Sequence, residues 1–112
     1  MSRLSTHVLD VALGRPAAGL ALRLEALDGE RWRPLVTAIT DGDGRVADLL
    51  AGAALEPHTY RLTFETGAYF RATGRATFYP RVDVTFQVAA AGEHHHVPLL
   101  LSPFGYSTYR GS

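Results

Sequence analysis

The fold is decided by the C-terminal stretch, residues 94–112, which reads HHHVPLLLSPFGYSTYRGS. Three histidines lead into an apolar run, a Ser-Pro-Phe-Gly segment typical of a turn follows, and β-branched and aromatic residues that favour a strand come last. Most chain ends bury little and stay loose. This composition predicts instead a strand from His94 to Leu101, a turn, and a closing strand.

Side-chain alternation divides the histidines of this stretch between two faces. In an extended strand, neighbouring side chains point to opposite sides. His94 and His96 then share one face with Pro98, and the other face is apolar and carries His95, Val97, Leu99 and Leu101. A proline favours an edge strand or a bulge beside the two paired imidazoles.

Upstream of this stretch, the sequence alternates between short strand patterns and turns. Strands are expected at residues 6–13, 20–25, 32–40, 60–65 and 82–88, with a short strand and loop within 46–55. Asp28-Gly29 predicts a hairpin turn, and Pro34 an edge or a bulge. Residues 67–74, bounded by two glycines, could hold one or two helical turns. The pattern predicts an all-β, antiparallel β-sandwich.

Composition narrows the classes of function. The 112 residues are nearly half apolar and carry a formal net charge of zero, so we expect one domain over residues 1–112, with no nucleic-acid or membrane partner. There is no cysteine, which excludes thiolate chemistry and disulfides. Without an apolar leader or a long apolar run, a cytoplasmic location is the expectation.

Taken singly, the candidate functional residues have ordinary explanations. His7 could be a surface or core histidine whose hydrogen bonds are satisfied, Arg45 a solvated turn residue, and Tyr109 a side chain that only packs against its neighbours. The glycines at 42 and 44 mimic a dinucleotide-binding fingerprint, but hairpins surround them rather than a βαβ unit. Composition and spacing alone leave the function open.

Four motifs, taken together in their order along the chain, favour a functional interpretation of these residues. They are LSTHVLD at 4–10, DGDGR at 41–45, FYPRV at 78–82, and the segment from His96 to the terminal YRGS. Together they cover nearly the whole chain, and they resemble the transthyretin-like hydroxyisourate hydrolases. One departure is His95, where members of that family usually carry tyrosine or another bulky residue.

The resemblance implies a transthyretin-like β-sandwich of two four-stranded sheets with one short helix, assembled as a homotetramer that is a dimer of dimers. It also implies hydrolysis of 5-hydroxyisourate to 2-oxo-4-hydroxy-4-carboxy-5-ureidoimidazoline in urate degradation, in a channel between dimers. The family's catalytic trio maps onto His7, Arg45 and His96, and further substrate contacts map onto Tyr109 and Ser112. No cofactor and no metal are implied.

The residue types suit this chemistry. Histidine can accept a proton near neutral pH, and arginine offers a planar cationic fork to a developing oxyanion. We expect His96 to activate water, His7 to orient the substrate, and Arg45 to stabilise the oxyanion.

Two other functions compete with hydrolysis. A transthyretin-like carrier would bind a small aromatic ligand without chemistry, but hormone carriers lack the His/Arg/His set. A metal-binding module would use His94, His95 and His96, yet adjacent residues on a strand face opposite ways and cannot converge on one ion. We expect His94 and His95 to be solvated edge residues without a role in the site.

Overall fold

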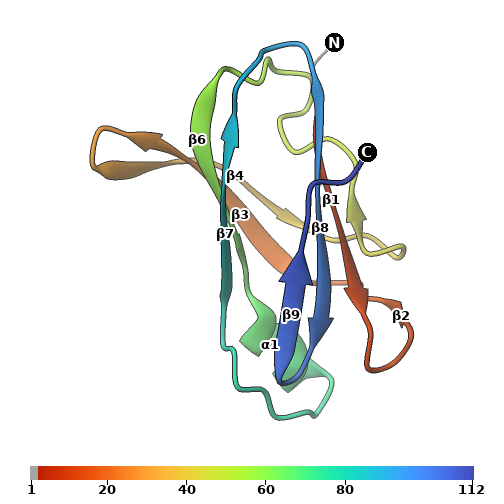
Figure 1. The fold of residues 1–112 in the computed structure, drawn as a ribbon. Helices are drawn as coiled ribbons and strands as arrows, with labels where there is room; N and C mark the ends of the chain where they lie inside the picture. Colours follow the sequence, from red (N-terminus) through yellow and green to blue (C-terminus); the bar gives the residue numbers. More distant parts are fainter. Residues whose placement is uncertain (1–2) are drawn as a thin grey trace.

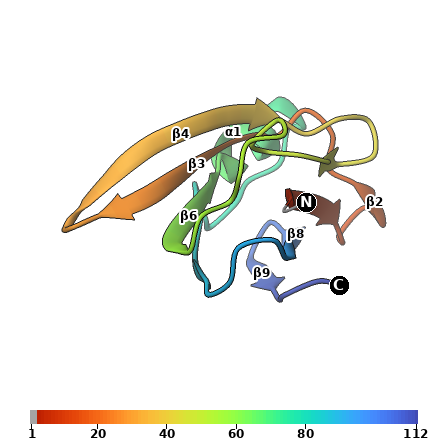
Figure 2. The same ribbon diagram turned by 90° about the horizontal axis from the view of Figure 1, so that it is seen from above.

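The computed structural model describes residues 3–112, which form two packed β-sheets and one short helix (Figure 1). The elements are β1 (Arg3–Asp10), β2 (Arg15–Pro16), β3 (Ala21–Asp28), β4 (Arg31–Ile39), β5 (Arg45–Val46), β6 (His58–Phe64), α1 (Thr66–Ala72), β7 (Val82–Val88), β8 (His94–Ser102) and β9 (Gly105–Thr108). Seen from above, β3, β4 and β6 form one layer and β1, β8 and β9 the other (Figure 2). The expected β-sandwich with a short helix is confirmed.

The first sheet joins the two ends of the chain. Its strand order is β2-β1-β8-β9, and β5 pairs with β1 as a fifth strand. β1 and β8 run parallel, from Arg3 opposite His94 to Asp10 opposite Leu101. A parallel pair needs a long crossover, and here most of the chain forms it. The other pairs in this sheet are antiparallel.

The second sheet has the order β4-β3-β6-β7 and is antiparallel throughout. β4 is an edge strand, and its register with β3 shifts where Leu24 faces Val36 but Glu25 faces Pro34. Proline has no N–H to donate, so an edge strand beside an irregularity accommodates it. The expectation for Pro34 is confirmed.

The core lies between the sheets. Alternate residues of the strands point inward, as in β3, where Leu22, Leu24 and Ala26 are buried. The same alternation buries Leu99 and Leu101 of β8, and the helix contributes Phe70. The burial pattern therefore fixes which face of each strand is left for other roles.

β1 ends three residues earlier than the sequence predicts. The Gly14 N–H donates to the Asp10 carbonyl at 2.9 Å, and the Leu13 N–H donates to Asp10 Oδ1 at 3.1 Å. These bonds turn the chain after Asp10 and leave Val11 and Leu13 exposed. The predicted strand end at Leu13 is wrong because the alternating apolar residues continue into the turn.

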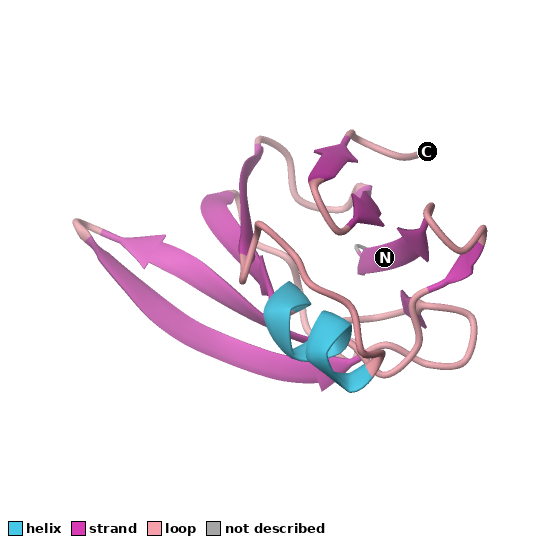
Figure 3. Ribbon diagram, turned by 90° about the horizontal axis from the view of Figure 1, so that it is seen from below, coloured by secondary structure: helices cyan, strands magenta, loops and turns pink. Residues whose placement is uncertain are grey.

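The Asp10 side chain ties β1 to the helical segment at the end of the sandwich, which Figure 3 shows from below. Asp10 is fully buried, Tyr69 Oη donates to its Oδ2 at 2.7 Å, and Arg75 pairs with both carboxylate oxygens. Burial raises the pKa of Asp10, but hydrogen bonds from Arg75, Tyr69 and the Leu13 N–H outweigh it, so the net pKa lies below the ordinary value. The ionised carboxylate therefore stabilises the fold.

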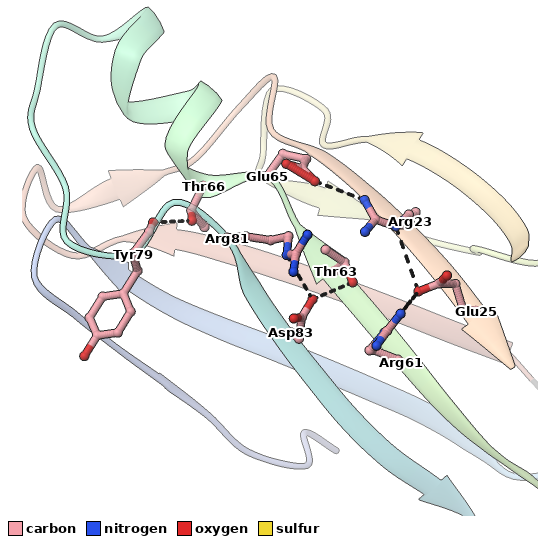
Figure 4. Close-up of polar contacts among 9 residues, drawn as sticks. All are labelled: Arg23, Glu25, Arg61, Thr63, Glu65, Thr66, Tyr79, Arg81 and Asp83. Carbon is pink, nitrogen blue, oxygen red and sulfur yellow. Dashed lines mark hydrogen bonds and ion pairs between the residues drawn. The ribbon is translucent and has the colours of Figure 1, made fainter. Parts of the chain in front are cut away.

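The outer face of the second sheet carries alternating basic and acidic side chains that form ion pairs (Figure 4). Arg61 Nη2 lies 2.7 Å from Glu25 Oε1, and Arg23 Nη1 lies 3.0 Å from Glu65 Oε1. The Arg61 guanidinium also lies 4.3 Å from the centre of the Trp32 ring. Positive and negative side chains alternate along these contacts, so this face carries no patch of a single charge.

Within residues 3–112, no helix is both long and apolar enough to cross a membrane.

Asp10→Asn should lower the free energy of unfolding by about 3 kcal/mol, because it leaves the half-buried Arg75 charge without its partner. The Asp10 pKa is depressed in the folded state, so its contribution is complete above the unfolded pKa of about 3.9 and is lost as pH falls through the folded value. Denaturant unfolding at pH 7 and pH 3 measures both effects. The control is Asp28→Asn at the exposed hairpin tip. Equal stability of the two variants at pH 7 would contradict the assignment.

Candidate functional site

The outer face of the first sheet gathers polar side chains from three strands. The parallel register sets Ser5 of β1 opposite His96 of β8, and the antiparallel register sets His7 opposite Arg45 of β5. Directly opposed residues share a face of a sheet. A cavity of about 240 Å³ opens here, lined by Arg3, Ser5, Thr6, Arg45, Ala47, His94, His96 and Ser112.

The structure brings together most of the residues that the sequence singled out. Arg45, His96 and Ser112 line this cavity. His7 lies beside it on the same face, opposite Arg45. Tyr109 lies elsewhere: it is 58% exposed and lines a second cavity, of about 300 Å³, with residues 84–87 of β7. His96 borders both cavities.

Arg45 is positioned by the turn that precedes it. Asp41 Oδ1 accepts the Arg45 N–H at 2.9 Å, and the Asp41 N–H donates to the Arg45 carbonyl at 3.0 Å. Gly44 has a φ of +73°, and a Cβ there would lie 2.4 Å from the Val8 carbonyl oxygen. Glycine therefore lets the turn lie against β1 and holds Arg45 across from His7.

His96 is held on both flanks of its ring. Its Nδ1 lies 2.8 Å from Ser5 Oγ. On the other flank, the Gly111 N–H donates to the His96 carbonyl at 2.9 Å, and a Cβ at Gly111 would lie 2.5 Å from His96 Cδ2. The absence of a side chain at Gly111 therefore lets the backbone lie against the imidazole of His96.

The pKa of His96 is lowered. Burial is the largest cause, followed by the positive potential of His94, His7 and Arg45, while a hydrogen bond with Ser5 acts in the opposite direction. A lowered pKa keeps the ring neutral at physiological pH and leaves a lone pair able to accept a proton.

His95 is not the solvated residue that the sequence predicted, whereas His94 is exposed as expected. His95 is only 5% exposed, on the core side, and its Nδ1 donates to the Glu93 carbonyl at 3.2 Å. His94 is exposed but belongs to the cavity: its ring stacks on that of His96 at 6.4 Å, and its Nε2 lies 3.4 Å from Ser5 Oγ. The predicted division of the histidines between two faces is confirmed.

Ser5 is the site residue that sequence reasoning missed. The alternation of a strand predicts that Ser5 shares a face with His7. It does not predict that Ser5 lies opposite His96, because no local pattern indicates a parallel pairing between the two ends of the chain. In the part of the chain that the structure describes, no group of three or more His, Cys, Asp or Glu side chains is arranged to hold a metal ion.

The arrangement offers an imidazole with a lowered pKa, an exposed guanidinium and hydroxyl groups around a small polar cavity. Such a set can activate water at His96 while Arg45 faces negative charge on a bound molecule. The residues suit hydrolysis of a small, planar, electron-poor compound, and equally the binding of such a compound.

Comparison with known proteins narrows this choice. The family described as HIUase/Transthyretin matches residues 4–111. The mouse 5-hydroxyisourate hydrolase is 48% identical over 113 residues, covering 99% of this chain and 96% of the mouse protein. Among solved structures, the 5-hydroxyisourate hydrolase of Klebsiella pneumoniae superposes with a TM-score of 0.87 at 40% identity, covering 98% of this chain and 99% of that one. Sea bream transthyretin in complex with thyroxine gives a TM-score of 0.91 at 31% identity, covering 97% and 94%.

Gly111→Ala should displace the His96 ring, because the added methyl group would overlap Cδ2. The imidazole resonances of His96 in an NMR spectrum should shift, with little change in melting temperature. Gly105→Ala, whose Cβ would meet its nearest neighbour at 3.7 Å, is the matched control in the same segment. Unchanged His96 resonances in the Gly111 variant would show that the tail does not constrain the ring.

Proposed function

This chain belongs to the HIUase/transthyretin family, and on that basis we propose that it hydrolyses 5-hydroxyisourate to 2-oxo-4-hydroxy-4-carboxy-5-ureidoimidazoline. The observation that carries the proposal is the meeting of His7, Arg45 and His96 on one face, in a chain whose hydrolase relatives share up to half of its residues. The cytoplasmic location stays a prediction.

In the proposed mechanism, neutral His96 takes a proton from water. The resulting hydroxide adds to a ring carbonyl of the substrate, and the carbonyl oxygen takes up negative charge beside the Arg45 guanidinium. The C–N bond then breaks, and the proton held on the imidazole passes to the leaving nitrogen. His7, opposite Arg45, orients the ring. Ser112, which lines the cavity, supplies a further substrate contact.

Tyr109 has a different place in this proposal. In the single chain it lies away from the cavity that Arg45 lines, and it is largely exposed. Its hydroxyl can contact the substrate only if the tail adjusts or another subunit closes the site. The proposed substrate contact of Tyr109 is therefore tied to assembly.

The second candidate function is a carrier of a small aromatic ligand. It is favoured by the close superposition on sea bream transthyretin. Sequence identity favours the hydrolase, at 48% with the mouse enzyme against 31% with that transthyretin. The two functions differ in whether the bound compound is consumed.

We also propose a homotetramer built as a dimer of dimers. β7 and β9 each pair with a single neighbour and leave an edge open, and open edges are natural sites of pairing between copies. The β8–β9 turn and the loop before β7 expose Phe104 and Phe78, each 72% exposed. Val11 and Leu13 of the β1–β2 turn are exposed as well. Exposed apolar side chains of this kind fit contacts between subunits.

The function is tested by generating 5-hydroxyisourate with urate oxidase and following its ultraviolet absorbance with and without the protein. We expect decay well above the spontaneous rate. A rate equal to the background, with binding of the compound detected by calorimetry, would favour the carrier.

His96→Asn and His7→Asn should each lower turnover by roughly 10²–10⁴-fold, as expected for lost acid–base and orienting help. Arg45→Lys keeps the charge but loses the planar fork and should also be costly. Because the pKa of His96 is lowered, kcat/KM should fall only on the acid side, below about pH 6.5, as the ring protonates. Steady-state kinetics across pH measures these effects, and a wild-type rate in His96→Asn would remove that residue from the mechanism.

Sedimentation velocity at micromolar concentration should show a tetramer. Phe104→Ser should weaken it, because it removes an exposed apolar side chain from the proposed contact surface. Thr37→Ser, on the outer edge strand β4, is the matched control. A monomeric wild-type protein would contradict both the proposed tetramer and the proposal that assembly brings Tyr109 to the substrate.

A further inference from the structure

Ser5 lies between the two imidazoles of the outer face. Its Oγ is 2.8 Å from Nδ1 of His96 and 3.4 Å from Nε2 of His94. The residue is only 8% exposed, and the two rings lie nearly parallel, with an interplanar angle of 18°. The hydroxyl thus links one half-buried imidazole to one exposed imidazole.

A serine hydroxyl carries a single proton, so this link has two directions. Ser5 can donate to His96, which then carries its proton on Nε2 and has no free lone pair there. Alternatively, His96 Nδ1–H donates to Ser5 Oγ, and Ser5 donates its own proton to His94 Nε2. Only the second direction satisfies all three groups in one chain of hydrogen bonds and leaves His96 Nε2 free to accept a proton.

The surroundings favour the second direction. Burial of the ring and the positive charge of Arg45 both act against a lasting positive charge on His96. His94 lies at the exposed end of the chain of contacts, where solvent can receive a proton.

We propose that Ser5 is a positioning residue that fixes the His96 tautomer and links His96 to His94 as a proton relay. As water gives a proton to His96 Nε2, the Nδ1 proton passes to Ser5 Oγ and the Ser5 hydroxyl proton passes to His94 Nε2. One O–H bond of water is broken, one N–H bond forms on His94, and His96 returns to the neutral state. The positive charge then rests on the exposed imidazole. When the C–N bond breaks, the transfers run in reverse: His94 returns a proton to Ser5 Oγ, Ser5 returns one to His96 Nδ1, and His96 Nε2 gives its proton to the leaving nitrogen.

The relay rests on the proposed hydrolysis, but its geometry can be tested without catalysis. Nitrogen-15 NMR of the side chains at pH 7.5 distinguishes a protonated ring nitrogen from an unprotonated one. In the wild-type protein, His96 should be protonated on Nδ1 and unprotonated on Nε2. In Ser5→Ala the preference should weaken, and in Thr37→Ala, which removes a hydroxyl from the other sheet, it should stay. A wild-type His96 protonated on Nε2 overturns the proposal whether or not the protein is an enzyme.

Kinetics test the transfer itself. Ser5→Ala and His94→Ala should each lower kcat about 10-fold, less than the 10²–10⁴-fold expected for loss of the base, with KM nearly unchanged. Because both act in one chain, the double variant should be no slower than the slower single variant. Added imidazole should restore kcat in His94→Ala but not in His96→Asn.

Each outcome has a distinct meaning. A wild-type kcat in His94→Ala, or losses that multiply in the double variant, overturns the relay while leaving hydrolysis intact. No hydrolysis by the wild-type protein contradicts the proposed function, and the tautomer measured by NMR then decides the role of Ser5 alone.

Discussion

The parallel pairing of β1 with β8 is the constraint on which the candidate site depends. Eight consecutive pairs, from Arg3 opposite His94 to Asp10 opposite Leu101, set the register. Side chains alternate with a period of two, so a slip of one residue would turn Ser5 and His7 toward the core. The buried residues Leu4 and Val8 on β1, and Leu99 and Leu101 on β8, make such a slip costly. Hydrophobic burial on one face therefore fixes the polar geometry on the other.

Local patterns predicted the features that depend on one strand at a time. Alternation assigned His95 to the core face and His96 to the opposite face, and a missing N–H placed Pro34 on an edge strand with an irregular register. Pairing between distant strands has no comparable local signal, so the contacts of Ser5 with His96 and His94 could not be foreseen. The early end of β1 was missed because Val11 and Leu13 continue the apolar alternation into a turn.

The candidate trio came from a family resemblance, and the structure supplies physical reasons for its placement. Arg45 depends on Asp41 and on the left-handed conformation of Gly44, which lets the turn approach Val8. His96 depends on Ser5 and on the bare backbone of Gly111. Small residues (Gly44, Ser5 and Gly111) thus help to position Arg45 and His96. Tyr109 has no such support in the single chain, where it borders a different cavity.

The two ends of the molecule differ in how they would tolerate a tag. The β3–β4 hairpin reaches beyond the rest of the sandwich (Figure 2) and turns at the exposed residues Gly29 and Glu30. A fluorophore or an affinity peptide inserted there would extend into solvent from the sheet that does not carry His96. Ser112 lines the cavity itself, so any peptide joined to it would begin beside Arg45 and His96. A purification tag fused at that end would lie at the cavity and would compete with a bound ligand in every measurement of the site.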